Sequence, residues 1–128
     1  MPGDTVTLLH LKVVHHYVVP GQKDTLSVTI ASTKALSDCR VIIEASRVSS
    51  KGAEMQLGTY RVDGIELAAG KSLKFKYVYD VPSTMTRGTI VLRLGVFDAS
   101  GMHRYAWSPQ GVTVHVKGGK PAPDLLIG

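Results

Sequence analysis

The side chains of this chain that are best suited to holding a ligand are aromatic. The sequence has five Tyr, two Phe and one Trp, and Tyr60, Tyr105 and Trp107 stand where a ligand could reach them. Sugar rings have apolar C–H faces that stack on aromatic rings, and nearby polar groups orient the sugar hydroxyls. Each stacked ring contributes about 1 kcal/mol beyond the apolar area it buries, so two or three rings support only millimolar to high-micromolar binding. The polar candidates are Arg61, His103, Arg104 and Gln110.

Tyr105 and Trp107 also allow an interpretation that needs no ligand. They are two positions apart in the sequence, so their side chains share one face of a short strand. Sandwich domains commonly bury one tryptophan, and this chain has only one. Trp107 is therefore either a core residue that caps one end of the domain or an exposed ring that stacks on a ligand, and the sequence leaves both open.

The segment Gly64–Ser72 comes close to a phosphate-binding loop but lacks the required context. That loop needs a glycine five positions before its second glycine, a preceding parallel strand and a following helix. Position 65 is Ile65, and the residues after Ser72 alternate as a strand does. We expect a turn that leads into an edge strand.

No set of residues predicts catalysis, a metal site or a cofactor. His15 and His16 are adjacent, and adjacent residues of a strand point to opposite faces, so they are poorly placed to share an ion. The nucleophile motif Gly-x-Ser-x-Gly does not occur. A glycosidase needs two carboxylates across a cleft, but the acidic residues here lie mostly in or beside expected turns. These acids are Asp38, Asp63, Glu66, Asp80 and Asp98.

The apolar residues recur at every second position, which is the period of a β-strand. Leu26, Val28 and Ile30, for example, alternate with Ser and Thr, and turn signals such as Asp63-Gly64 separate such runs. About seven strands of this kind predict an all-β domain of two packed antiparallel sheets. The expected strands lie near residues 5–18, 24–32, 39–47, 55–62, 71–79, 88–98 and 111–117, with a short extra strand at 102–107.

Length and composition indicate one globular domain. The 128 residues are 44% hydrophobic and 20% charged, which suits a single core. We place the domain at residues 1–117 and expect the Gly- and Pro-rich residues 118–128 to form a linker or tail. Cys39 is the only cysteine, which excludes an internal disulfide, and it opens an apolar run, so it should be buried.

Charge and hydropathy argue against nucleic acid and membrane as partners. The net charge of +5 is spread along the chain, without the basic stripe and interleaved aromatics that nucleic-acid binders usually have. No apolar stretch approaches the length that spans a bilayer.

Three stretches of the sequence resemble immunoglobulin-like accessory modules of bacterial secreted glycoside hydrolases. They are Val19-Pro20-Gly21 with Asp24–Ile30, then Leu67–Phe75 with Tyr79–Pro82, and finally Gly88–Asp98 with Tyr105-Ala106-Trp107. The resemblance covers roughly residues 17–117. It implies an immunoglobulin-like or fibronectin III-like antiparallel β-sandwich of the carbohydrate-binding-module kind. It also implies a secreted or extracytoplasmic location as part of a larger protein.

Two functions are consistent with this reasoning. The first is a non-catalytic accessory module that binds polysaccharide weakly through Tyr60, Tyr105 and Trp107, beside neighbouring domains of a longer chain. The alternative is a structural spacer or protein-docking domain with no glycan affinity. Its contact patch would be formed by apolar residues at outward-facing positions, namely Ile42, Val78 and Val91.

Overall fold

The computed structural model describes residues 5–49, 51–83, 85–108 and 111–118. Within these residues the regular structure is all β-strand, and no helix is long and apolar enough to cross a membrane. The strands are β1 (Val6–Val13), β2 (Tyr17–Val18), β3 (Lys23–Ser32), β4 (Leu36–Val48), β5 (Glu54–Leu67), β6 (Ser72–Asp80), β7 (Gly88–Phe97), β8 (Arg104–Trp107) and β9 (Val112–Val116).

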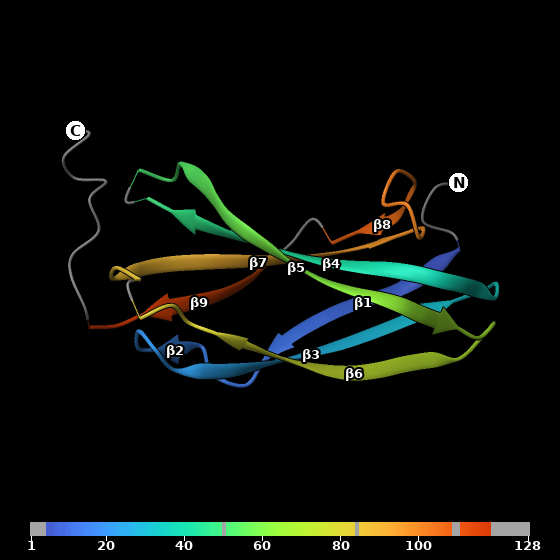
Figure 1. Ribbon diagram of the computed structural model, residues 1–128, viewed down its shortest axis with the longest axis horizontal. Helices are drawn as coiled ribbons and strands as arrows, with labels where there is room; N and C mark the ends of the chain where they lie inside the picture. The colour runs from blue at the N-terminus through green and yellow to red at the C-terminus, as the bar shows by residue number, and fades with distance from the viewer. Residues whose placement is uncertain (1–4, 50, 84, 109–110, 119–128) are drawn as a thin grey trace.

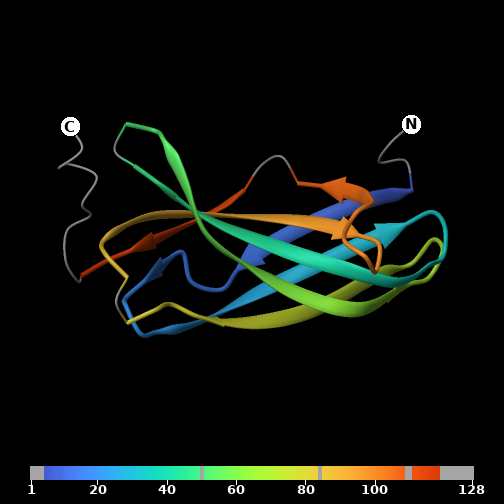
Figure 2. The same cartoon turned by 45° about the horizontal axis from the view of Figure 1, so that its top comes forward.

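The strands form two sheets that face each other (Figures 1 and 2). One sheet has three strands in the order β1-β3-β6, and the other has six, in the order β2-β9-β7-β4-β5 with β8 paired to β7. The named strands pair antiparallel, except for the short parallel pair β2–β9. The all-β, sandwich-like architecture predicted from the two-residue period is confirmed.

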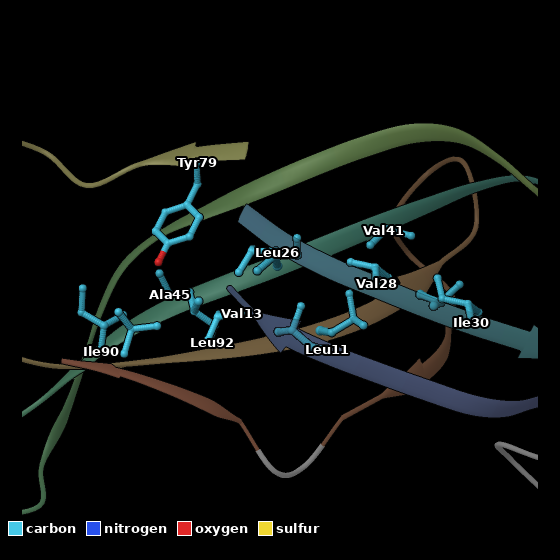
Figure 3. Close-up of a cluster of buried hydrophobic side chains, with 14 of the residues drawn as sticks. Leu11, Val13, Leu26, Val28, Ile30, Val41, Ala45, Tyr79, Ile90 and Leu92 are labelled. Atoms are coloured by element: carbon cyan, nitrogen blue, oxygen red, sulfur yellow. The ribbon is translucent and has the colours of Figure 1, made fainter. Parts of the chain in front are cut away.

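The core lies between the two sheets and consists of the inward members of each alternating run. Leu26, Val28 and Ile30 of β3 are 0% exposed, as are Val41 and Ile43 of β4. Figure 3 shows side chains from both sheets meeting in this layer. Cys39 is buried there as well, as predicted. Residues of opposite parity on β4 and β7 must consequently lie on the outer face of the six-stranded sheet.

The strand predicted at residues 5–18 is wrong, because the chain forms two strands there in different sheets. β1 belongs to the three-stranded sheet and β2 to the six-stranded sheet. The chain leaves the first sheet where the backbone N–H of His15 donates to the Asp24 carboxylate, over 3.0 Å. It joins the second where the backbone N–H of His115 donates to the His16 carbonyl, over 2.7 Å. The buried positions change from odd to even numbers across this crossing, from Val13 to Val18, and the four residues between them are exposed.

The turn expected at Asp63-Gly64 is also wrong, since β5 continues to Leu67. The pairing of β4 with β5 shifts register beside these two residues, between Cys39 and Val41, so they form an irregularity within the strand.

Two other predictions about the strands hold. The extra strand appears as β8. Within Gly64–Ser72 the expected turn is limited to residues 68–71, and β6, which follows it, is an edge strand as expected. Of the predicted tail at 118–128, all but Gly118 lies outside the described residues.

Candidate functional site

Trp107 lies on the outer face of the six-stranded sheet, the side turned away from the three-stranded sheet. On β7, Leu94 and Val96 are buried in the core, so Gly95 between them faces outward. Gly95 is paired with Trp107 of β8 and, on its other side, with Ile42 of β4. Directly paired residues of antiparallel strands share a face. The rings and side chains of this row therefore lie side by side on one surface.

The indole ring of Trp107 and the phenyl ring of Phe97 cover the backbone of Gly95. A Cβ placed on Gly95 would lie 2.7 Å from Cε1 of Phe97 and 2.8 Å from Cζ3 of Trp107, closer than real Cβ contacts. Gly95 is buried although it faces outward, while both rings are half-buried. Phe97 and Trp107 together form a surface that we call the aromatic platform.

Charged side chains lie beside the platform and are held by one carboxylate. Arg61 of β5 is paired with Ile42, and Arg40 of β4 with Phe97. Asp63 accepts a hydrogen bond from Nε of Arg40 at 2.8 Å and lies 3.3 Å from Nε of Arg61. Two guanidinium groups share one carboxylate here, which leaves one positive charge in excess. Arg40 also donates from Nη1 to the Ser100 carbonyl, over 3.5 Å. Each guanidinium has five N–H donors, and the more exposed Arg61 is the better placed of the two to meet the hydroxyls of a ligand.

Tyr60 faces the opposite way from Trp107. It is paired with the fully buried Ile43 of β4, which places its ring between the two sheets. The ring centroid of Tyr60 lies 5.6 Å from that of Tyr77 and 6.0 Å from that of Tyr79. Burial raises the pKa of the Tyr60 hydroxyl above its ordinary value. Tyr60, Tyr105 and Trp107, which we expected to bind one ligand together, therefore do not share one surface, although β5 and β8 belong to the same sheet.

Tyr105 lies where the pairing of β7 with β8 shifts register, between Val96 and Phe97. It is half-buried and packs against the core, and the ring of His103 meets it edge-on at a centroid distance of 5.0 Å. Arg104 is exposed and paired with Phe97. Gln110 lies outside the described residues. Of the predicted binding residues, the structure thus groups Trp107, Arg61 and Arg104 around the platform.

The sequence reasoning missed Phe97, which forms the platform with Trp107. It also missed Arg40, which is paired with Phe97, and Asp63, which binds Arg40. One signal was available, because a glycine inside a strand often marks the close approach of another group. Gly95 is such a glycine, in a run of Leu and Val. The signal says that something approaches, but it does not say which ring does.

The outward apolar residues proposed for docking do not form a single patch. Ile42 and Val91 both lie on the outer face of the six-stranded sheet, and Ile42 adjoins the platform. Val78 belongs to β6 in the other sheet, where its side chain is 58% exposed. Only the first two can contact the same partner surface.

The histidines near the N-terminus are engaged separately. Nδ1 of His15 lies 3.0 Å from Oδ1 of the buried Asp24, and the Tyr79 hydroxyl donates to Oδ2 of the same carboxylate over 2.9 Å. Nδ1 of His16 lies 3.1 Å from the Thr113 carbonyl oxygen. Among the described residues, no three His, Cys, Asp or Glu side chains are grouped so that they could hold a metal ion.

Comparison with known proteins finds similarity in structure only. No family model matches the sequence, and no curated protein matches it. The C-terminal domain of Wzt superposes with a TM-score of 0.67 at 12% identity, over 93% of this chain and 76% of that one. The alkylpurine DNA glycosylase AlkC of Pseudomonas fluorescens, bound to DNA containing an abasic site analog, gives 0.65 at 18% identity, over 90% and 31%.

A third similar structure is the cycloisomaltooligosaccharide glucanotransferase of Paenibacillus sp., complexed with cycloisomaltoheptaose. It gives a TM-score of 0.57 at 10% identity, over 84% of this chain and 13% of the enzyme. At these identities the likeness concerns the fold alone. The chain spans about a third of the length of the glycosylase and a much smaller part of the glucanotransferase.

Proposed function

We propose that this chain is a non-catalytic, immunoglobulin-like or fibronectin III-like accessory module of a larger, secreted carbohydrate-active protein, and that it binds polysaccharide weakly. The binding surface in this proposal is the outer face of the six-stranded sheet around the aromatic platform. The observation that carries it is the pair of rings, Phe97 and Trp107, lying over Gly95 with guanidinium groups beside them. A similar fold within the much longer glucanotransferase is compatible with this role.

The chemistry of the platform suits a sugar chain lying along the sheet. The rings offer apolar faces for C–H stacking, while Arg61, with a side chain 58% exposed, offers N–H donors for hydroxyl oxygens. Asp63 and Arg104 extend the polar rim. Two stacked rings, at about 1 kcal/mol each beyond the apolar area they bury, give weak binding, in the millimolar range. Tyr60 takes no part in this proposal because its ring faces the interior.

Trp107→Ala tests the proposal directly. We expect affinity electrophoresis against a panel of soluble polysaccharides to show retardation of the wild-type domain by at least one glycan. Removal of the indole should weaken that binding about tenfold, equivalent to about 1.4 kcal/mol. Tyr17→Ala is the matched control, because Tyr17 is a 60% exposed ring on β2 and not part of the platform. If no glycan retards the domain, or both variants bind equally, glycan binding at this face is excluded.

The second candidate is a docking module, favoured by Ile42 and Val91 on the same outer face. In that case an apolar surface of a neighbouring domain would cover the row that includes Ile42. Ile42→Asp should then lower the melting temperature of the parent protein while leaving that of the isolated domain nearly unchanged. If the parent protein melts at the same temperature with Ile42→Asp, the docking function fails.

A further inference from the structure

A pocket lies between the two sheets of the domain. Figures 1 and 2 show how β5 and β6 diverge on this side of the molecule. It has a volume of about 190 Å³. Its walls come from β4, β5 and β7 on one side and from β6 and the segment after it on the other. The side chains on which the argument depends are Leu57, Tyr79, Val81, Met85, Ile90 and Leu92.

The pocket exists because two small residues oppose each other at an inward position. Ala45 of β4 is paired with Gly58 of β5, whereas the next inward pair along the same strands is Ile43 with Tyr60. A Cβ placed on Gly58 would meet no atom within 4 Å. Larger side chains at these two positions would fill the layer as they do two residues further on. Here the space is left open.

The wall opposite Ala45 is fixed in place rather than loose. Tyr79 projects from β6 toward Ala45 and Leu92 of the other sheet (Figure 3). Its hydroxyl is already bonded to the buried Asp24, at 2.9 Å. The backbone of Val81, which follows β6, donates to the Gln22 carbonyl and accepts from the N–H of Gly21, each over 2.8 Å. The pocket is therefore preformed, and a ligand would not have to order these groups.

The chemistry of the lining changes from the inside to the mouth. Ile90, Leu92 and Val81 present only hydrocarbon, and the buried hydroxyl of Tyr79 is occupied by Asp24. The charged lining residue, Asp80, lies at the rim, where its carboxylate is held by Nζ of Lys23 at 2.7 Å. Both side chains of that ion pair are about 70% exposed. Thr59 and Tyr60 bring hydroxyl groups to the lining, but an ionised group would lose its hydration inside such a pocket without gaining a charged partner there.

From this we infer that the pocket binds a small, uncharged, apolar ligand of about one ring in size. A dry apolar cavity of about 150 Å³ holds one benzene molecule, and this pocket is somewhat larger and open at one side. The flexible side chain of Met85 and the 39% exposed Leu57 can adjust to the shape of the ligand at the entrance. The site lies on the inner side of the six-stranded sheet, so it does not depend on the glycan-binding proposal for the outer side.

Benzene is the probe, and methyl NMR signals of the full chain are the measurement. We expect benzene to cause saturable shifts of the methyl signals of Met85, Leu57, Ile90 and Leu92, while those of Leu8 on β1 stay unchanged. Gly58→Leu should weaken benzene binding at least tenfold, because its side chain would occupy the open space beside Ala45. Thr29→Leu is the control, since it adds the same side chain on the outward side of β3, between the buried Val28 and Ile30.

Leu57→Asp is a second pocket variant, which tests benzene binding even if Gly58→Leu disturbs folding. Leu57 is exposed enough to tolerate a carboxylate, and a charge at the entrance should weaken benzene binding severalfold. Absence of saturable shifts in the wild type would overturn the inference, as would unchanged affinity in both pocket variants. If the same methyl signals move with protein concentration alone, a second copy of the chain occupies the pocket and the inference is equally overturned.

Discussion

Gly95 and Gly58 are both glycines within strands of the six-stranded sheet, and their surroundings are opposite. Gly95 on β7 lies under the rings of Phe97 and Trp107, so that a Cβ has no room. Gly58 on β5 faces open space, so that a Cβ would touch nothing within 4 Å. One glycine admits a covering group on the outer face, and the other leaves a pocket on the inner face. What a strand glycine does is therefore decided by the residues across from it.

The largest expected effect is that of Gly95→Val, which tests the crowded side of this comparison. The added methyl groups must displace Phe97 or Trp107, and overpacking of this kind costs about 1–3 kcal/mol. We expect a lower urea midpoint and a red-shifted emission of Trp107, the only tryptophan. Gly58→Val introduces the same side chain and is the control. Equal effects of the two substitutions would remove the contrast between the glycines.

Tyr79→Phe tests whether the pocket side is held rigid by a polar anchor. The Tyr79 hydroxyl donates to the buried Asp24 carboxylate, and a hydrogen bond to a charged group contributes about 1.5–3 kcal/mol. We expect Tyr79→Phe to lower the free energy of unfolding by about 2 kcal/mol. Urea denaturation at neutral pH measures the loss. A loss below about 0.5 kcal/mol would mean that the backbone N–H groups of His15 and Thr25, which also donate to the Asp24 carboxylate, are sufficient.

Stability at alkaline pH should depend on the ionisation of Tyr79 and Tyr60. Burial raises the pKa of Tyr79, and its hydrogen bond to Asp24 raises it further, while burial also raises the pKa of Tyr60. In the unfolded chain both hydroxyls ionise near the ordinary value of 10.0. Their contribution is thus complete below that value and is lost as the pH rises toward the folded-state pKa. The urea midpoint should fall above about pH 10, and less steeply in Tyr79→Phe.

Gly58→Ala should have a small and opposite effect. The position has room for a Cβ and an ordinary backbone conformation, since no positive φ is found there. Replacing glycine at such a position stabilises a protein by about 0.4–1 kcal/mol, mainly by restricting the unfolded chain. A rise in melting temperature measures this gain. A fall would show that the space beside Gly58 is not free.

Glu54→Gln should have the smallest effect and serves as a baseline on the exposed surface of the same strands. Nη1 of Arg93 donates to Glu54 over 2.6 Å, and this hydrogen bond lowers the pKa of Glu54. The stabilisation is present above the ordinary value of 4.5 and is lost as the pH falls through the folded-state pKa. We expect the acid-induced drop in urea midpoint to be only slightly smaller in Glu54→Gln. If the acid-induced drop in urea midpoint became much smaller in Glu54→Gln, this surface ion pair would contribute more to stability than the substitutions at Gly95 and Gly58 change it.

The two-residue period in the sequence was sufficient to locate most of the buried strand faces. Alternation of apolar residues located the buried faces of β3, β4 and β7, and the position of Cys39 in one such run predicted its burial. The prediction of a single strand over residues 5–18 failed where the hydrogen bond from His15 to Asp24 ends β1. The side chain that ends β1 belongs to a different strand, β3, and no local pattern reports that contact.

The site was harder to predict because it depends on which residues are paired across strands. Whether Tyr60 faces inward follows from its pairing with Ile43, and whether Trp107 faces outward follows from its pairing with Gly95. The pocket likewise requires that Ala45 meet Gly58. The sequence predicts which side chains of one strand share a face. The register shifts between β4 and β5 and between β7 and β8 decide which of these faces lie on the same side of the sheet.

Because Cys39 is buried, its reaction with a thiol reagent can report when the two sheets separate. It is the only thiol in the chain, it is 0% exposed, and burial raises its pKa so that little thiolate is available. An alkylating reagent can modify it only in molecules whose β4 has separated from the opposing sheet. The rate of alkylation thus measures how often the sheets separate, and the measurement needs no added label and no removal of a second cysteine.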